Sequence, residues 1–473
     1  MRYLKFLFLA AVLTFALAAC GAGGEATVTP PPAGGGEQQP PTGNDAPHTV
    51  ELGPPERDLG GSNFRIVTWW TEGCTETADP DSASMRARWD DRAEMEQRYN
   101  FRMHYYRFGS WGDVRDNVQP EILAGNRDYH IWIVEPTWFA THHGQRLFAP
   151  IPMRYFEDDF GINWVNSVIE LTMRDGSPHG FASGGEFAGG IYFNQRLFEE
   201  AGLAYDLPFT LQREGNWTWD TFMDAARRLS RDIDGDGIID TWALTTFATD
   251  LLNRAVVSNG AAYAQIDPDT GEFVNSTNTD AFLEAVDFAA QLRREMLAFI
   301  QGDVGGEWDA FVQMFNDGHG AMRSAGHYVA ANIQLEDPWG FVAFPRGPRA
   351  QNHYDWIARN INVIPHFFSE EEVSDIMFAM QMWIRPIPDD DPDDWIFANL
   401  VNHPDVRSVE ETMRYFTRPP EFQLLPAHQM MPGLGHTLGE VFQWRIWGGE
   451  EAAVIVEEGQ LVWGDFINRV NAL

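Results

Sequence analysis

The chain has 473 residues, with 69 acidic side chains against 33 lysines and arginines, and its formal net charge is −36. A surface this negative repels nucleic acid, anionic lipid and anionic substrates, and it favours neutral or cationic ligands. Lys5 is the only lysine, so Schiff-base chemistry is excluded for the chain beyond its first few residues.

The first twenty residues have the pattern of a secretory signal with a lipidation site. Arg2 and Lys5 precede an apolar run over residues 6–16, and small residues then lead to Cys20. The apolar run is shorter than the about 20 residues that cross a bilayer, which argues against a transmembrane helix. We predict a signal peptide over residues 1–19 and a lipid anchor on Cys20 at the extracellular face of the cell membrane. The alternative is a plain secretory signal in which the cysteine is coincidental.

Residues 20–62 are predicted to be a disordered linker behind the lipidated cysteine. The segment is rich in Gly, Pro, Thr and Gln and has no apolar periodicity. Residues 63–473 form the folded part, which exceeds the roughly 250 to 300 residues at which one core usually divides, so we expect two lobes. Cys74 has no second cysteine to pair with once Cys20 is lipidated, so no internal disulfide is expected.

The first folded segments alternate between strands and helices. Residues 63–70, 101–106 and 130–134 read as strands, and residues 84–99 read as a helix. This alternation predicts parallel α/β units, in which ligands bind beyond the carboxyl ends of the strands. The candidate binding residues at those ends are Trp70, Glu72, Glu135, Thr137 and Trp138.

A second group of elements follows residue 190. Residues 190–194 read as a strand and residues 196–201 as a short helix closed by Gly202. Thr218 is a predicted helix cap, because the apolar residues after it fall on one helical face: Trp219, Phe222, Met223, Ala226 and Leu229.

An acidic loop comes directly after this predicted helix. Asp232, Asp234, Asp236 and Asp240 occupy positions one, three, five and nine of a calcium-binding loop, with the Ile238 carbonyl at position seven. A hard cation prefers six to eight oxygen ligands, which alternate carboxylates around a glycine turn can supply. Position twelve departs from the pattern because it holds alanine instead of glutamate. We expect a structural Ca²⁺ here, and the alternative is a solvated acidic turn without a metal.

An ordered set of short motifs resembles the extracellular solute-binding lipoproteins of bacterial ABC importers, in the group that binds sugars and oligosaccharides. The motifs are Leu17 to Cys20, residues 192–194 with 197–202, residues 217–220 before the acidic loop, residues 315–318 with Ala321, Met322 and Gly326, and residues 342–348. Each piece is common, but their order is fairly specific.

The resemblance implies an α/β fold of the two-lobed periplasmic-binding-protein type (type II), with doubly wound sheets joined by a hinge that the chain crosses three times. Lobe 1 would comprise residues 63–186 and 327–385, and lobe 2 residues 187–326 and 386–473. Ligand would lie between the lobes. To the five candidates at the strand ends, the family correspondence adds Thr249 and Asp250 from lobe 2, with His327 and Tyr328 just past Gly326.

The function implied is capture of a small neutral solute, a sugar or oligosaccharide, by hinge closure and delivery to the transmembrane subunits of an ABC permease. The protein would be a monomer, would hold the membrane through its lipid anchor only, and would catalyse no reaction. One alternative is a surface-anchored glycoside hydrolase that uses two carboxylates, although the chain lacks a His-Glu-x-x-His zinc motif and a Gly-x-Ser-x-Gly elbow. Another alternative is a lipid-anchored adhesin or sensor partner that feeds no importer.

Overall fold

The computed structural model describes residues 57–70, 83–157, 160–184, 189–267, 270, 272–300, 303, 309–356, 360–387, 396, 399–416, 422–425 and 439–472. Cys20, the predicted linker as far as residue 56, Glu72 and Cys74 lie outside this part. Among the described helices, none combines the length and the apolar character that a membrane crossing needs.

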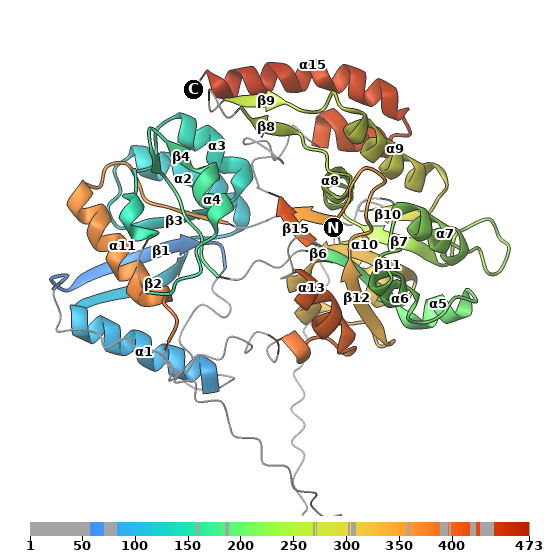
Figure 1. The fold of residues 1–473 in the computed structure, drawn as a ribbon, viewed down its shortest axis with the longest axis horizontal. Helices are drawn as coiled ribbons and strands as arrows, with labels where there is room; N and C mark the ends of the chain where they lie inside the picture. The colour runs from blue at the N-terminus through green and yellow to red at the C-terminus, as the bar shows by residue number, and fades with distance from the viewer. Residues whose placement is uncertain are drawn as a thin grey trace, which may run out of the picture. The chain divides into compact units, whose positions relative to one another are not determined.

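The first sheet has four strands in the order β14-β3-β1-β2 (Figure 1). They are β1 (Ser62–Thr68), β2 (Phe101–Arg107), β3 (Ile131–Val134) and β14 (Ile361–Val363). β1 is parallel to β2 and β3, as the alternation of elements predicted, whereas β14 is antiparallel to β3. The strands predicted at residues 63–70, 101–106 and 130–134 are therefore confirmed.

Alternate side chains of each strand point to opposite faces of this sheet. Helices pack on both sides, so both faces are buried. Ile66 and Ile133 pack on one face with α1 (Ala83–Tyr99) and α11 (Glu370–Ile384). Val67 and Trp132 pack on the other face with α2 (Trp111–Leu123), α3 (Pro136–Gly144) and α4 (Asn166–Leu171). A turn η1 (Met153–Tyr155) and a short hairpin of β4 (Met173–Arg174) and β5 (Ser177–Pro178) complete this part.

The second sheet has five strands in the order β10-β7-β11-β6-β12. They are β6 (Gly189–Asn194), β7 (Trp242–Thr246), β10 (Ala298–Ile300), β11 (Gly320–Gly326) and β12 (Trp339–Ala343). β7 is parallel to β10 and β11, but β6 is antiparallel to both of its neighbours. The second sheet is thus mixed, with parallel and antiparallel neighbours.

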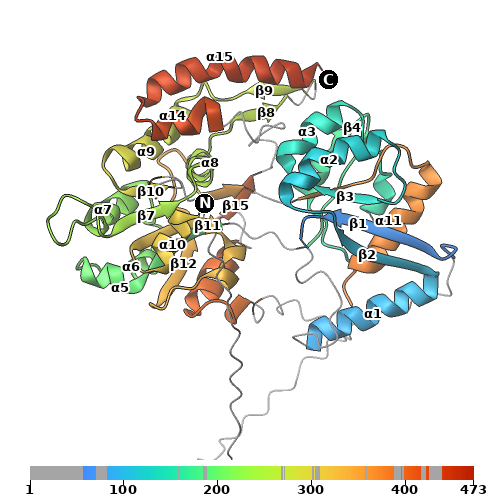
Figure 2. The same ribbon diagram turned by 180° about the vertical axis from the view of Figure 1, so that it is seen from behind.

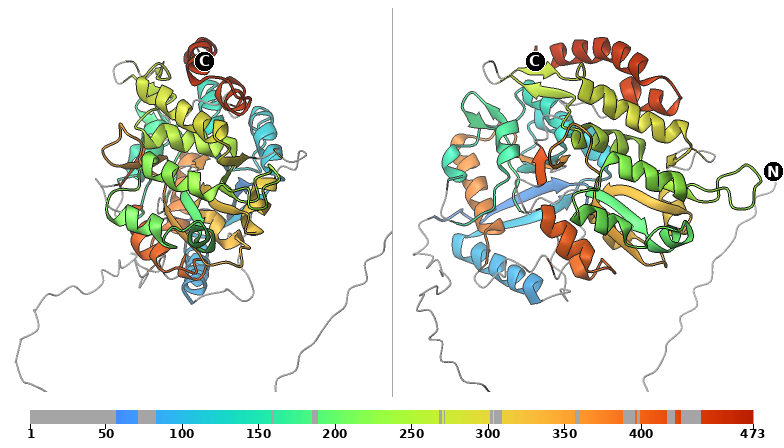
Figure 3. Two further views of the ribbon diagram at one scale, coloured as in Figure 1. Left: turned by 90° about the vertical axis from the view of Figure 1, so that its right-hand side faces the viewer. Right: turned by 45° about the vertical axis from the view of Figure 1, so that its right-hand side comes forward.

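Helices cover one face of the second sheet. α7 (Trp219–Leu229) begins at the predicted cap Thr218 and buries all five of its predicted apolar residues. α8 (Ala248–Ser258) and α9 (Asp280–Arg294) pack side by side in the same core (Figures 1 and 3). The short helices α5 (Gln195–Glu200) and α6 (Leu207–Arg213) also contribute to this core.

The remaining elements complete this second part of the molecule. Tyr192 and Phe341 face a separate core with α10 (Ala310–Asn316), η2 (His327–Asn332), η3 (Ser408–Met413) and α13 (Arg414–Phe416). β13 (His353–Trp356) pairs with β15 (Phe422–Leu425), and β8 (Ala264–Ile266) pairs with β9 (Phe273–Asn275). η5 (Gly439–Gln443) and α14 (Trp444–Trp447) lead into α15 (Ala452–Asn471), which packs against β9 and α9 (Figure 2).

The predicted return of the chain to lobe 1 at residue 327 is wrong. η2 packs on the second sheet, β12 is one of its strands, and β13 lies against α8. Only β14 and α11 join the first sheet. The apolar run of β12 is fully buried, so its sequence pattern does not distinguish one sheet from the other.

Candidate functional site

Four tryptophans gather beyond the carboxyl ends of the strands of the first sheet. β1 ends at Thr68, and the half-buried Trp69 and Trp70 follow with their rings 4.7 Å apart. Trp138, in the first turn of α3, lies 5.6 Å from Trp69 and 5.0 Å from Trp111 at the start of α2. This group, the tryptophan cluster, offers the large flat apolar faces that stack on sugar rings.

Polar groups accompany the tryptophan cluster. Glu135 follows β3 and accepts a hydrogen bond of 2.7 Å from the indole Nε1 of Trp111. Trp138 is only 6% exposed, and its Nε1 has no hydrogen-bond partner within the described part of the chain. Buried donors of this kind normally find an acceptor, so this N–H is an unsatisfied polar group in the part of the chain that the structure describes.

Asp250 lies at the corresponding end of the second sheet, in the first turn of α8. One of its oxygens, Oδ2, accepts hydrogen bonds from Arg254 Nε at 2.9 Å and from Ser324 Oγ at 2.6 Å. The neighbouring Thr249 donates through Oγ1 to Gln443 at 2.7 Å. These contacts fix the carboxylate at the point where β7 and β11 end.

Arg254, which bonds to Asp250, also belongs to a buried ion pair. Arg254 Nη1 lies 2.5 Å from Asp355 Oδ2 in β13, and the same oxygen accepts the backbone N–H of Gly189 at 2.6 Å. Burial lowers the pKa of Arg254, but the charges of Asp250 and Asp355 outweigh it and raise that pKa overall. The guanidinium therefore stays charged and ties α8 to the first residue of β6.

Tyr328 and His327 follow β11 at the same end of the sheet. The buried Tyr192 hydroxyl donates to the carbonyl oxygen of His327 at 2.8 Å, which fixes the backbone where the strand ends. Tyr328 is 70% exposed, and protein covers the remainder of its surface. Its pKa is raised, first by this partial desolvation and then by the nearby charge of Asp250, with a smaller effect from Glu135.

The nine predicted ligand residues fall into three classes. The structure gathers Trp70, Glu135 and Trp138 in one group, and Thr249, Asp250, His327 and Tyr328 in another. Glu72 lies outside the described residues, and Thr137 belongs to α3, although its side chain is not among those described. Contact of these residues with a ligand stays a prediction.

Sequence reasoning missed Trp69, Trp111 and Arg323. Trp111 follows the carboxyl end of β2, so applying the strand-end rule to that strand would have found it. Arg323 is a charged residue within the otherwise uncharged strand β11, which is itself a signal.

The acidic loop brings three of its predicted ligands together. Carboxylate oxygens of Asp232, Asp234 and Asp240 all lie within 4.8 Å of one another. The Asp236 carboxylate is not part of this group, and it accepts the backbone N–H of Ile238 at 2.7 Å. All donors are oxygens, which suits Ca²⁺, and the loop turns through glycines at positive φ.

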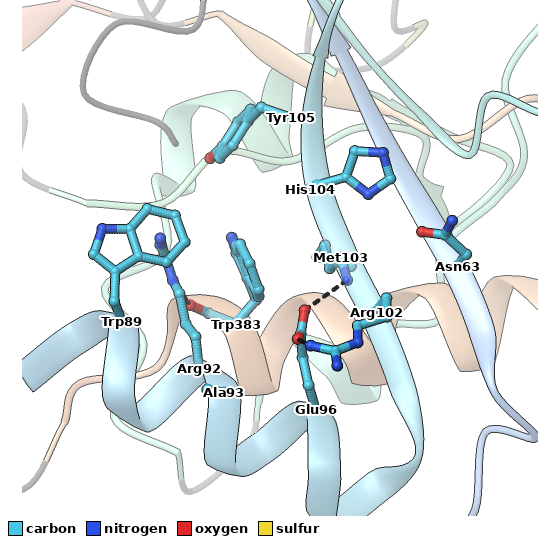
Figure 4. A pocket seen from close by; sticks show the side chains of 10 residues that line it. All are labelled: Asn63, Trp89, Arg92, Ala93, Glu96, Arg102, Met103, His104, Tyr105 and Trp383. Carbon is cyan, nitrogen blue, oxygen red and sulfur yellow. Dashed lines mark hydrogen bonds and ion pairs between the residues drawn. The ribbon is translucent and has the colours of Figure 1, made fainter. Parts of the chain in front are cut away.

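A pocket of about 420 Å³ lies elsewhere on the first sheet, between α1 and the edge strand β2 (Figure 4). The guanidinium of Arg92 sits between the indoles of Trp89 and Trp383, at 4.7 and 4.4 Å from the ring centres. The pocket also reaches Asn63 and Arg102, which are at the amino ends of their strands. Its position differs from the strand carboxyl ends at which α/β folds bind ligands.

Comparison with known proteins identifies relatives of the fold. The family model described as "Bacterial extracellular solute-binding protein" matches residues 106–364, more than half of the chain. A search of curated proteins found no match.

Solved structures match over almost their whole length. The ABC substrate-binding protein Lmo0181 from Listeria monocytogenes, in complex with cycloalternan, is 14% identical with a TM-score of 0.59, covering 86% of this chain and 99% of that one. UgpB from Mycobacterium tuberculosis, in complex with glycerophosphocholine, is 15% identical with a TM-score of 0.61, covering 86% and 98%. The galacto-N-biose/lacto-N-biose I-binding protein of the Bifidobacterium longum ABC transporter is 15% identical with a TM-score of 0.58, covering 87% and 98%. At these identities the likeness establishes a shared fold.

Proposed function

Because this chain belongs to the bacterial extracellular solute-binding protein family, we propose that it captures a sugar or oligosaccharide and delivers it to an ABC permease. Its fold is the α/β fold of type II periplasmic binding proteins. The observation that carries the proposal is the tryptophan cluster beyond β1 and β3, with the carboxylate of Glu135 beside it.

The two groups of side chains suit the two surfaces of a sugar. A pyranose ring has apolar CH faces, which stack on indoles, and a rim of hydroxyls, which bind carboxylates, amides and guanidinium groups. The tryptophan cluster supplies the first kind of contact, and Asp250 with its neighbours supplies the second. A ligand that contacts both groups only in a closed state shifts the population toward that state, and no covalent bond changes.

The family and the solved structures described above are binding proteins, and nothing in them favours the glycoside hydrolase alternative. We therefore propose that the chain has no enzymatic activity. Incubation with oligosaccharides tests this, because release of reducing ends would contradict it.

Ligand identity is tested with the solutes of the structural neighbours. The panel is cycloalternan, lacto-N-biose, glycerophosphocholine, α-D-tagatose and maltose. We expect at least one of the sugars to raise the midpoint of thermal unfolding and to bind in calorimetry, because a ligand of the folded state stabilises it. Failure of all four sugars, with or without binding of glycerophosphocholine, would contradict the proposal for these solutes.

Paired tryptophan variants locate the site. Trp111→Ala removes one member of the tryptophan cluster and should weaken sugar binding about 5- to 30-fold, since an aromatic face contributes on the order of 1 to 2 kcal/mol. Trp89→Ala is the matched control, because Trp89 lines the pocket of Figure 4 and should leave binding unchanged. If Trp89→Ala weakens sugar binding and Trp111→Ala does not, the sugar site lies in that pocket instead of at the tryptophan cluster.

We propose further that Cys20 carries the lipid anchor and that this anchor alone attaches the protein to the extracellular face of the membrane. We also propose that the protein works as a monomer. A Cys20→Ser variant should appear in the culture medium instead of the membrane fraction. Deletion of the gene should abolish uptake of the bound solute, whereas unchanged uptake would favour the adhesin or sensor alternative. Gel filtration tests the oligomeric state, and we expect the protein to elute at the size of a monomer.

The acidic loop is proposed to hold a structural Ca²⁺ through Asp232, Asp234, Asp240 and further oxygens. The convergence of three carboxylates supports it, and the ion would join the residues that precede β7. The double variant Asp234→Ala/Asp236→Ala and a chelator should each lower the unfolding temperature, and their effects should not add. If the unaltered protein is equally stable with and without chelator, the calcium assignment is wrong.

A further inference from the structure

Arg323 is a buried cation without an ion pair. It lies in the central strand β11, is only 7% exposed, and its Nε has no hydrogen-bond partner. Its guanidinium makes no salt bridge with any residue of the described part, and its one aromatic contact is with Phe311, whose ring centre is 5.8 Å away. Arg254, the other buried arginine of this sheet end, has two carboxylate partners.

An arrangement of this kind costs stability in the ligand-free protein. Charged side chains are seldom buried unless they are paired, because desolvation removes their hydration without replacement. Burial lowers the pKa of Arg323, although Tyr192, Asp250 and Tyr328 act in the opposite direction. The surroundings therefore compensate the charge incompletely.

The guanidinium is close to the predicted binding residues. Asp250 and Tyr328 are among the groups whose charges act on it, and the adjacent Ser324 bonds to Asp250. Asp250 uses Oδ2 for both of these hydrogen bonds, and Oδ1 makes none with the residues that the structure describes.

We propose that Arg323 is a specificity-determining residue that donates hydrogen bonds to one hydroxyl oxygen of the solute while Asp250 accepts a hydrogen bond from the neighbouring hydroxyl. The inference rests on the proposed sugar-binding function and names the solute as neutral, with adjacent hydroxyls. A hydrogen-bond donor and a hydrogen-bond acceptor together match the two hydroxyls of a vicinal diol. An anionic group in the same place would meet the Asp250 carboxylate and the net charge of −36.

The experiment compares Arg323→Met with Arg254→Met in the mature protein. The unfolding midpoint is measured without ligand, and the affinity is measured for each panel solute that binds the unaltered protein. Arg323→Met should leave the midpoint unchanged or raise it, because it removes an unpaired buried cation, and should weaken binding of the sugar at least about 10-fold. Arg254→Met should lower the midpoint, because it takes an ion-pair partner from Asp250 and from the buried Asp355.

The outcomes separate this inference from the function it rests on. A fall in the midpoint of Arg323→Met comparable to that of Arg254→Met would make Arg323 a structural residue and overturn the inference. Unchanged sugar affinity in Arg323→Met would also overturn it while leaving sugar binding intact. If no panel sugar binds the unaltered protein, the proposed function fails for these solutes, and the midpoint comparison still decides whether Arg323 is structural.

Discussion

The buried pair of Arg254 and Asp355 allows a quantitative test of how α8 is held against β6 and β13. The side chain of Arg254 is 5% exposed and that of Asp355 is 2% exposed, so removing one of them takes an ion-pair partner from a desolvated charge. Arg254→Met should therefore cost about 3 to 5 kcal/mol of unfolding free energy. The double variant Arg254→Met/Asp355→Leu removes the Asp355 carboxylate as well. It also leaves the N–H of Gly189 without that acceptor, which costs about 1 to 3 kcal/mol of unfolding free energy.

Urea unfolding followed by tryptophan fluorescence measures all three variants and completes a double-mutant cycle with Asp355→Leu. We expect the double variant to be more stable than the sum of the single variants predicts, by at least about 1 kcal/mol. Additive costs, or a cost below about 1 kcal/mol for Arg254→Met, would show that water or rearrangement solvates Asp355 and that the pair does not hold these elements together.

Two other properties of the molecule follow from its buried groups. Burial lowers the pKa of His142 to about 4 and that of His143 to about 3, from the ordinary 6.5. Both are neutral in the folded protein, so the unfolded chain binds more protons below pH 6.5, and the unfolding temperature should hold above that pH and fall as the pH drops toward 4. For His142 the difference corresponds to about 3 kcal/mol at most, and a flat profile of calorimetric midpoints between pH 7 and 4.5 would contradict it. Gly190→Ala should cost more than about 2 kcal/mol in urea unfolding, because its Cβ would lie 2.0 Å from the carbonyl oxygen of Val342 across β6 and β12, and a neutral effect would show that the two strands separate easily.

Local chemistry explains which parts of the fold could be predicted. α7 was predicted to the residue at its start, since Thr218 caps it and its apolar residues share one face. The strand-end rule found Trp70, Glu135 and Trp138, because the carboxyl end of a strand is visible in sequence as the end of a buried apolar run. These are short-range signals, and they need no knowledge of strand order.

Pairing between distant segments could not be predicted in the same way. β12 is antiparallel to β6, and nothing in the five residues Trp339–Ala343 specifies that partner. The predicted boundary at residue 327 therefore lies two strands, β12 and β13, before the strand that joins the first sheet. Likewise, the contact of Asp355 with Arg254 joins residues that are 101 positions apart, and neither residue has a local motif that identifies its partner.

The two groups of candidate residues differ in a way that bears on specificity. The tryptophan cluster presents aromatic faces that accept many ring-shaped solutes, because stacking depends weakly on the pattern of hydroxyls. A donor and an acceptor at fixed positions, as at Arg323 and Asp250, discriminate strongly, since a solute without the matching hydroxyls leaves both groups desolvated and unpaired. Affinity should therefore follow the tryptophans, and the choice among sugars should follow the charged group. Variants of the two groups should accordingly have different effects on the measured affinities. Trp111→Ala should lower the affinity for every sugar that binds, and Arg323→Met should reduce the differences in affinity among the sugars.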